Sequence, residues 1–98
     1  MIAGIGAKTQ EPALFRAGCE KVFQPADLVE LLDVRKLDID LIFRKEDTII
    51  MVQPGLIRPH WFRDIAAVGM LWQVPGHEPV RLGTEEERKA WRRLKPKG

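Results

Sequence analysis

Six basic side chains and one tryptophan gather at the C-terminal end of this 98-residue chain. They are Arg88, Lys89, Trp91, Arg92, Arg93, Lys95 and Lys97. Residues 88–98 contain no acid, whereas the rest of the chain carries ten bases and fourteen acids. Guanidinium and ammonium groups bind phosphates, and an indole beside them can stack on a base. These seven residues form the candidate binding site, with nucleic acid or an acidic protein surface as the expected partner.

Trp91 has a second interpretation. Together with Ala90 and Leu94 it forms an apolar stripe on the predicted terminal helix. A short terminal helix needs an anchor on the rest of the protein, because isolated short helices are unstable in water. Trp91 is therefore either a contact for the partner or the residue that holds the helix to the sheet.

The other reactive side chains predict neither a catalytic centre nor a metal or cofactor site. Cys19 is the lone cysteine, which fits a reducing compartment, and its place between helix and strand predicts a small buried thiol. His60 and His77 fall at a helix start and in a turn, where surface histidines are common. Asp38 and Asp40 could suggest a magnesium pair, but two acids on the exposed face of a strand explain them more simply.

Strand and helix signals alternate along the chain. Strands are predicted at 2–5, 20–23, 48–52 and 70–74, and helices from Thr9 to Gly18, from Pro25, from Pro59 to Gly69 and over 84–95. Thr84 and Glu87 form a capping box at the start of the last helix. Residues 37–43 alternate as a strand would, but an irregular insertion before a buried strand at 48–52 fits equally. Residues 80–82 are compatible with a short edge strand.

This order predicts an α/β fold with a small, mostly parallel sheet flanked by helices, flavodoxin-like in layout, and a C-terminal basic helix. The length fits a single domain over 1–98. No apolar run approaches the ~20 residues of a membrane span, and the first residues lack the basic start of a signal peptide. We therefore expect a cytoplasmic protein without a membrane partner.

Two segments carry a resemblance to a known family. Ala17-Gly18-Cys19-Glu20-Lys21-Val22-Phe23 and Arg44-Lys45-Glu46-Asp47-Thr48-Ile49-Ile50-Met51-Val52 resemble consecutive core segments of the serine recombinase (resolvase/invertase) catalytic domain. The order of elements extends the resemblance over residues 2–75. The resemblance implies a resolvase-like domain.

The positions that hold the family's catalytic groups differ in this chain. Aligning the first strand places Thr9 at the nucleophilic serine. After the third strand, Leu56 and Pro59 stand at the two arginines of the family, and Arg58 is one place out of register. Phosphoryl transfer depends on a preorganised set of cations, so we expect no recombinase activity. Residual chemistry at Thr9, with Lys8 and Arg58 as cations, is a weaker hypothesis.

Together these observations predict a non-catalytic binding domain that contacts nucleic acid or a nucleic-acid-associated complex through its basic terminal helix. The resemblance implies that this domain is resolvase-like and of phage or mobile-element origin. A homodimer through that helix and an apolar sheet edge is compatible with the sequence. The rival hypothesis is a protein–protein interaction module, such as a phage-encoded inhibitor of a host complex.

Overall fold

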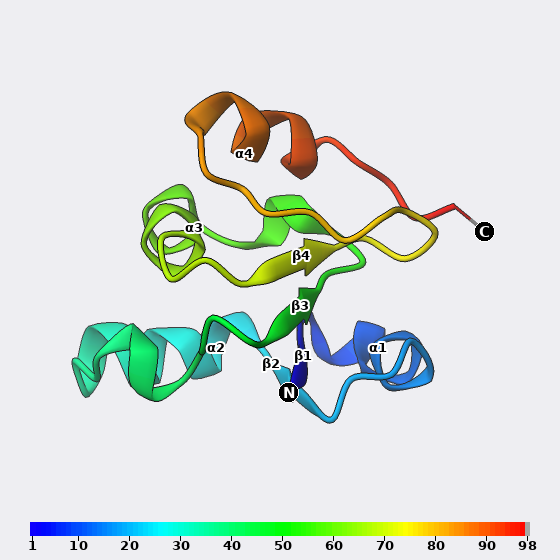
Figure 1. Ribbon diagram of the computed structural model, residues 1–98. Coiled ribbons are helices and arrows are strands. Elements are labelled where there is room, and N and C mark those ends of the chain that lie inside the picture. The colour runs from blue at the N-terminus through cyan, green and yellow to red at the C-terminus, as the bar shows by residue number, and fades with distance from the viewer. Residues whose placement is uncertain (98) are drawn as a thin grey trace.

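The computed structural model describes residues 1–97 and shows a four-stranded, fully parallel sheet with helices around it (Figure 1). The strands are β1 (Ile2–Ile5), β2 (Lys21–Phe23), β3 (Thr48–Ile50) and β4 (Leu71–Gln73), in the spatial order β2-β1-β3-β4. The predicted α/β class is thus confirmed, and so are the four strands, although β2, β3 and β4 are shorter than predicted.

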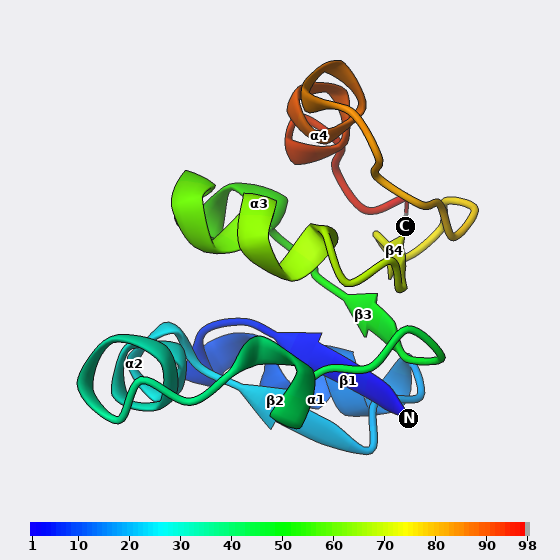
Figure 2. The same cartoon turned by 60° about the vertical axis from the view of Figure 1, so that its left-hand side comes forward.

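The helices are α1 (Glu11–Arg16), α2 (Pro25–Leu28), α3 (Pro59–Ala66) and α4 (Glu85–Arg92). The connection from β1 to β2 runs toward one edge of the sheet, whereas the connections from β2 to β3 and from β3 to β4 run toward the opposite edge. Right-handed crossovers in opposite directions put their helices on opposite faces, so α1 lies on one face while α2 and α3 cover the other. α4 lies beyond β4, beside α3 (Figures 1 and 2).

The main core lies between the sheet and the face formed by α2 and α3, and α4 closes its upper end. Alternate strand residues point into it, because side chains change face at every residue of a strand. The buried strand residues on this face are Ala3, Ile5, Phe23, Ile49 and Trp72. α3 contributes Trp61, Phe62 and Ile65 at helical spacing.

A smaller cluster of Leu14, Cys19 and Ile50 lies under α1. Gly4 and Gly6 allow α1 to lie close to β1. A Cβ atom on Gly4 would come within 3.1 Å of Leu14 Cδ1, and one on Gly6 within 2.6 Å of Gln10 Oε1. These two glycines therefore serve packing.

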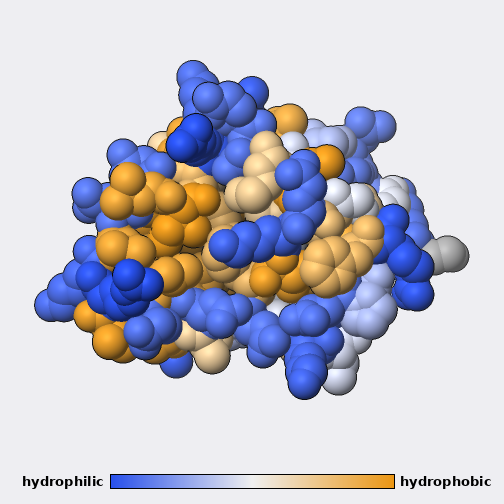
Figure 3. Space-filling view, turned by 90° about the horizontal axis from the view of Figure 1, so that it is seen from below, coloured by the Kyte–Doolittle hydropathy of each residue, from blue (hydrophilic) through white to orange (hydrophobic). Residues whose placement is uncertain are grey.

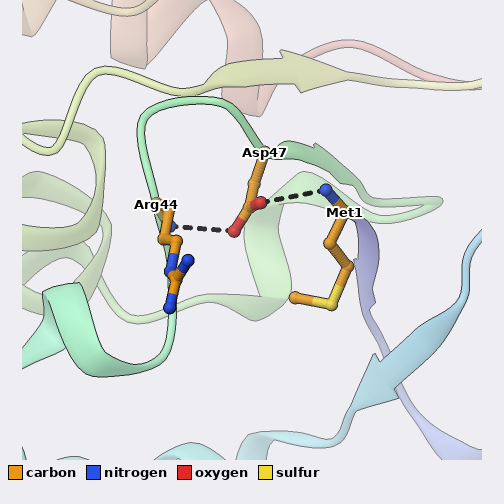
Figure 4. Close-up of polar contacts among 3 residues, drawn as sticks. All are labelled: Met1, Arg44 and Asp47. Carbon is orange, nitrogen blue, oxygen red and sulfur yellow. Dashed lines mark hydrogen bonds and ion pairs between the residues drawn. The ribbon is translucent and has the colours of Figure 1, made fainter.

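Asp47 is a buried acid that ties the first strand to the turn before β3 (Figure 4). Its Oδ1 lies 3.1 Å from the Met1 α-ammonium, and its Oδ2 accepts a hydrogen bond of 2.8 Å from the Arg44 backbone N–H. Both carboxylate oxygens are therefore paired, which a buried charge requires. This aspartate lies inside the second segment of the recombinase resemblance, and here its role is structural.

Three local predictions need correction or completion. Residues 37–43 form no strand, because Ile39–Leu41 is a 3-10 turn, so the irregular alternative is the correct one. Thr9 does not cap α1: it lies in a 3-10 turn at Lys8–Gln10, and Gln10 is the N-cap residue. Val80 makes one antiparallel bridge to Trp72, without a strand over 80–82.

The helix from Pro25 continues past α2 as a π-helical segment, Val29–Val34. Within residues 1–97, no helix combines the length and the apolar composition that crossing a membrane demands.

Candidate nucleic-acid interface

α4 begins as its sequence predicts. Thr84 Oγ1 accepts a hydrogen bond of 3.1 Å from the Glu87 backbone N–H, and the Thr84 N–H donates one of 3.0 Å to Glu87 Oε1. Three acids occupy the first turn and two bases the last, which suits the helix dipole. The capping box therefore sets where the helix starts and, with it, which way each basic side chain points.

Trp91 points inward from α4. Only 2% of its surface is exposed. Its ring centroid lies 5.4 Å from those of both Phe62 and Trp72, at angles typical of aromatic packing. The structure thus places Trp91 as the anchor of the helix, and it leaves no indole face exposed for a base to stack on.

Arg92 also faces the body of the protein. Its Nη1 donates a hydrogen bond of 2.9 Å to the Ile57 carbonyl, and its Nη2 donates one of 3.4 Å to the Gly55 carbonyl. Its guanidinium carbon lies 5.8 Å from the centroid of the Phe62 ring. Arg92 is therefore a fixed cation that joins α4 to the segment between β3 and α3.

A groove runs between α3 and α4 with a volume of about 570 Å³. It is lined by Pro59, His60, Phe62 and Arg63 from α3 and by Glu85, Arg88, Lys89 and Arg92 from α4. We call it the cationic groove, because four of these side chains are permanent cations and only Glu85 is an acid. Like charges brought together around one hollow create a positive potential that attracts anions.

Among the seven predicted residues, the structure brings Arg88, Lys89 and Arg92 to this groove. Lys89 Nζ lies 3.4 Å from Glu85 Oε1, and both side chains are largely exposed, at 68% and 74%. Arg88 is half-buried against the groove. These are the members of the predicted set that point toward a common space.

Arg93, Lys95 and Lys97 lie outside the groove, on the exposed end that follows α4. This end is not a loose tail: the Lys95 carbonyl lies 2.7 Å from His77 Nε2, and the Lys97 backbone N–H donates to the Pro75 carbonyl at 3.1 Å. Gly76 makes this contact possible, since a Cβ atom there would meet Lys97 Cβ at 2.6 Å.

Arg63 and His60 belong to the groove but were not among the predicted residues. Arg63 is 69% exposed and lies 3.4 Å from its neighbour Asp64. Both residues lie on the polar side of α3, which the spacing of the apolar residues along this helix predicts. The sequence does not reveal that this side faces α4, because the two helices are joined by β4 and a long loop.

The fold offers a second expected place for a ligand, at the carboxyl ends of β1 and β3. In open α/β sheets ligands bind where the strand order reverses, which here is between these two strands. In this chain Gln10 Nε2 donates a hydrogen bond of 3.2 Å to Gln53 Oε1 across that point. Gln10 Oε1 also accepts from the Ala7 N–H at 3.0 Å. Two neutral amides thus bridge the crevice.

The positions aligned with recombinase catalytic groups follow β1 and β3 in the chain, each in a structural setting. Thr9 is exposed in the turn after β1, and Leu56 is half-buried against the core. Pro59 begins α3, and Arg58 is its N-cap residue with the guanidinium carbon 5.1 Å from the Trp61 ring centroid.

The remaining reactive groups have ordinary surroundings. Cys19 is buried, as predicted, and this burial raises the pKa of its thiol, so the reactive thiolate is disfavoured. Asp38 is the N-cap residue of a 3-10 turn and Asp40 lies within that turn, so neither lies on a strand. Within residues 1–97, no three His, Cys, Asp or Glu side chains are grouped as metal ligands would be.

No protein family matches this chain, and no curated protein or solved structure is significantly similar to it. The likeness to serine recombinases therefore rests on residues 17–23 and 44–52 and on the order of the elements. The candidate site rests on the geometry of α3 and α4.

Proposed function

We propose that this protein is a non-catalytic binding domain that contacts nucleic acid through the cationic groove. The observation that carries this proposal is the convergence of Arg63, Arg88, Lys89 and Arg92, from two helices, around one hollow. Phosphate groups are the anions that such an arrangement suits best, because guanidinium groups bind them with several parallel hydrogen bonds.

The ion pairs in and beside the groove do not block this use. Lys89 with Glu85 and Arg63 with Asp64 are exposed pairs between flexible side chains. Exposed pairs of this kind stabilise a protein by only about 0–1 kcal/mol. A phosphate can therefore replace the carboxylate as the partner of either base at little cost.

We further propose that the domain derives from a serine recombinase of a phage or mobile element and has lost its chemistry. Cleavage of a phosphodiester needs cations held around the reacting phosphate. Here the groove lies beside α4, whereas Thr9, at the position of the nucleophile, lies in the turn after β1. Of the positions aligned with catalytic groups, Pro59 lines the groove, whereas Thr9 does not.

The test is fluorescence anisotropy of labelled duplex DNA with the double variant Arg88→Ala/Lys89→Ala. Its matched control is Arg16→Ala/Arg35→Ala, which removes the same charge from exposed positions on α1 and after the π-helical segment. We expect the groove variant to bind at least about 10-fold more weakly and the control to bind nearly as the parent does. Equal loss in both variants would show that only net charge matters, and the proposed site would be wrong.

A second candidate function is a protein–protein interaction module. Val34 and Leu41 are 63% and 72% exposed, and both belong to the segment that follows α2. In the view from below, apolar side chains gather on the left, over this end of the molecule (Figure 3). An apolar patch at one end and bases at the other would suit a protein partner with an acidic surface.

Replacing Leu41 by serine separates the two candidates. A protein partner that uses the apolar patch would bind this variant more weakly, whereas DNA binding would stay unchanged. Pull-down of partners from a host lysate with the parent and the Leu41→Ser variant measures the first effect, and anisotropy measures the second.

A further inference from the structure

The phenylalanine and tryptophan side chains nearest the cationic groove are all buried. Phe62 forms part of its lining and is 1% exposed, while Trp61 and Trp91 are 4% and 2% exposed. Phe15 is the one phenylalanine or tryptophan of the chain that is mainly exposed, and it lies on α1, on the opposite face of the sheet. The groove thus offers cations without an exposed phenylalanine or tryptophan.

This combination limits what the groove can recognise. Proteins that hold single strands without sequence preference combine a basic groove with aromatic rings on which the bases stack. Charge alone favours the duplex, because a duplex releases more counterions per neutralised phosphate than a single strand does. Contacts to phosphates position a protein but carry no base sequence.

The cations are placed for a backbone rather than for one isolated anion. Arg88 and Arg92 are four residues apart, so they lie on one side of α4, about 6 Å apart along its axis. Arg63 faces the same hollow from α3. Arg92 is held by the carbonyls of residues 55 and 57, and its remaining N–H groups can still donate.

We infer that the cationic groove binds the sugar-phosphate backbone of duplex nucleic acid and does not read its bases. This inference rests on the proposed function and specifies its ligand: a double strand of any sequence. Arg63, Arg88, Lys89 and Arg92 supply the contacts.

The experiment measures anisotropy with two DNA duplexes of equal length and unrelated sequence, and with one strand of the first duplex, each across a salt series. We expect the duplexes to bind within about 2-fold of each other and both to bind at least about 5-fold tighter than the single strand. If all four basic side chains of the groove contact phosphates, the logarithm of the association constant for duplex DNA falls with the logarithm of the salt concentration with a slope of about −3.6.

Phe15→Ala provides the control, because Phe15 is 51% exposed on α1 and does not line the groove. This variant is expected to change affinity for the duplexes and for the single strand by less than about 2-fold, because no base stacks on that ring. A 10-fold preference for one duplex, tighter binding to the single strand, or a 10-fold loss of binding in Phe15→Ala would overturn the inference while leaving nucleic-acid binding intact. If none of the three ligands binds even at low salt, the proposed function fails and this inference with it.

Discussion

The buried and the exposed residues of α4 do different work. On the inner side, Trp91 packs against Phe62 and Trp72, and Arg92 donates to two backbone carbonyls. Lys89, at the rim of the cationic groove, is 68% exposed, and Arg93, outside the groove, is exposed as well. The number of arginines and lysines in a stretch of sequence therefore does not give the number that a partner can reach. Neighbouring residues of a helix point in different directions, so some are buried and others are exposed.

Among the variants of α4, Trp91→Ala is expected to lower the free energy of unfolding most. Trp91→Ala removes a buried side chain from the contact with Phe62 and Trp72, and we expect a loss of about 3–5 kcal/mol in the free energy of unfolding. Urea denaturation followed by circular dichroism measures it. A loss below about 1 kcal/mol would mean that α4 is not docked as described.

Trp91→Phe sharpens the same comparison. The Trp91 Nε1–H is buried and has no hydrogen-bond partner among the described residues. Phenylalanine keeps an aromatic ring and removes this unsatisfied donor, so its cost is expected to be well below that of alanine.

Arg92→Ala comes next in size. It removes hydrogen bonds from a charged donor to the carbonyls of Ile57 and Gly55, and we expect the free energy of unfolding to fall by about 1.5–3 kcal/mol. Arg93→Ala is the matched control, because it removes the same side chain one residue further along, where it is exposed. Thermal and urea unfolding of the two variants, side by side, measure the difference. Equal stability would contradict the assignment of Arg92 to the inner side.

Thr84→Ala tests how much the capping box at the start of α4 contributes to stability. Loss of the Thr84 side chain leaves the Glu87 N–H without its acceptor, and the expected cost is about 0.5–2 kcal/mol. Thr84→Ser keeps the hydroxyl and should stay close to the parent. If alanine and serine behave alike in urea denaturation, the cap contributes nothing measurable.

Replacing the exposed basic residues of α4 is expected to change the free energy of unfolding least. Lys89→Ala/Arg93→Ala should change the free energy of unfolding by no more than about 0.5 kcal/mol, because both side chains are exposed and the Lys89 pair with Glu85 is weak. The same variant should still weaken binding to duplex DNA through Lys89. A variant that is less stable by more than about 1 kcal/mol would show that these exposed residues also stabilise the fold.

Local rules predicted much of the architecture. Pro59 and the capping box at Thr84 mark helix starts, and Gly18 has the positive φ of a helix stop. The prediction failed at Thr9, because the Gln10 side chain reaches the Ala7 N–H and a 3-10 turn precedes α1. The prediction left two alternatives for residues 37–43, a strand or an irregular insertion. An alternating pattern forms a strand only where a neighbouring strand can pair with it, and within residues 1–97 this segment pairs with none.

The candidate site was predicted less completely than the fold. Of the seven predicted residues, Arg88, Lys89 and Arg92 line the groove, whereas Arg63 and His60, which also line it, were not among the predicted residues. Trp91 was left between two roles, and its burial assigns it to anchoring. Arg93, Lys95 and Lys97 lie away from the groove, on an end held against the turn at Pro75 and His77.

The sequence by itself determined the order of strands and helices, the start of α4 and the excess of positive charge at the C-terminal end. These features depend on interactions between residues a few positions apart, which the order of amino acids contains directly. Only the tertiary structure decided which basic side chains are exposed to solvent and which residues lie next to them. Arg63 and Arg88 line one groove because Trp91 of α4 packs against Phe62 of α3, and such packing depends on a core that residues from the whole chain build together.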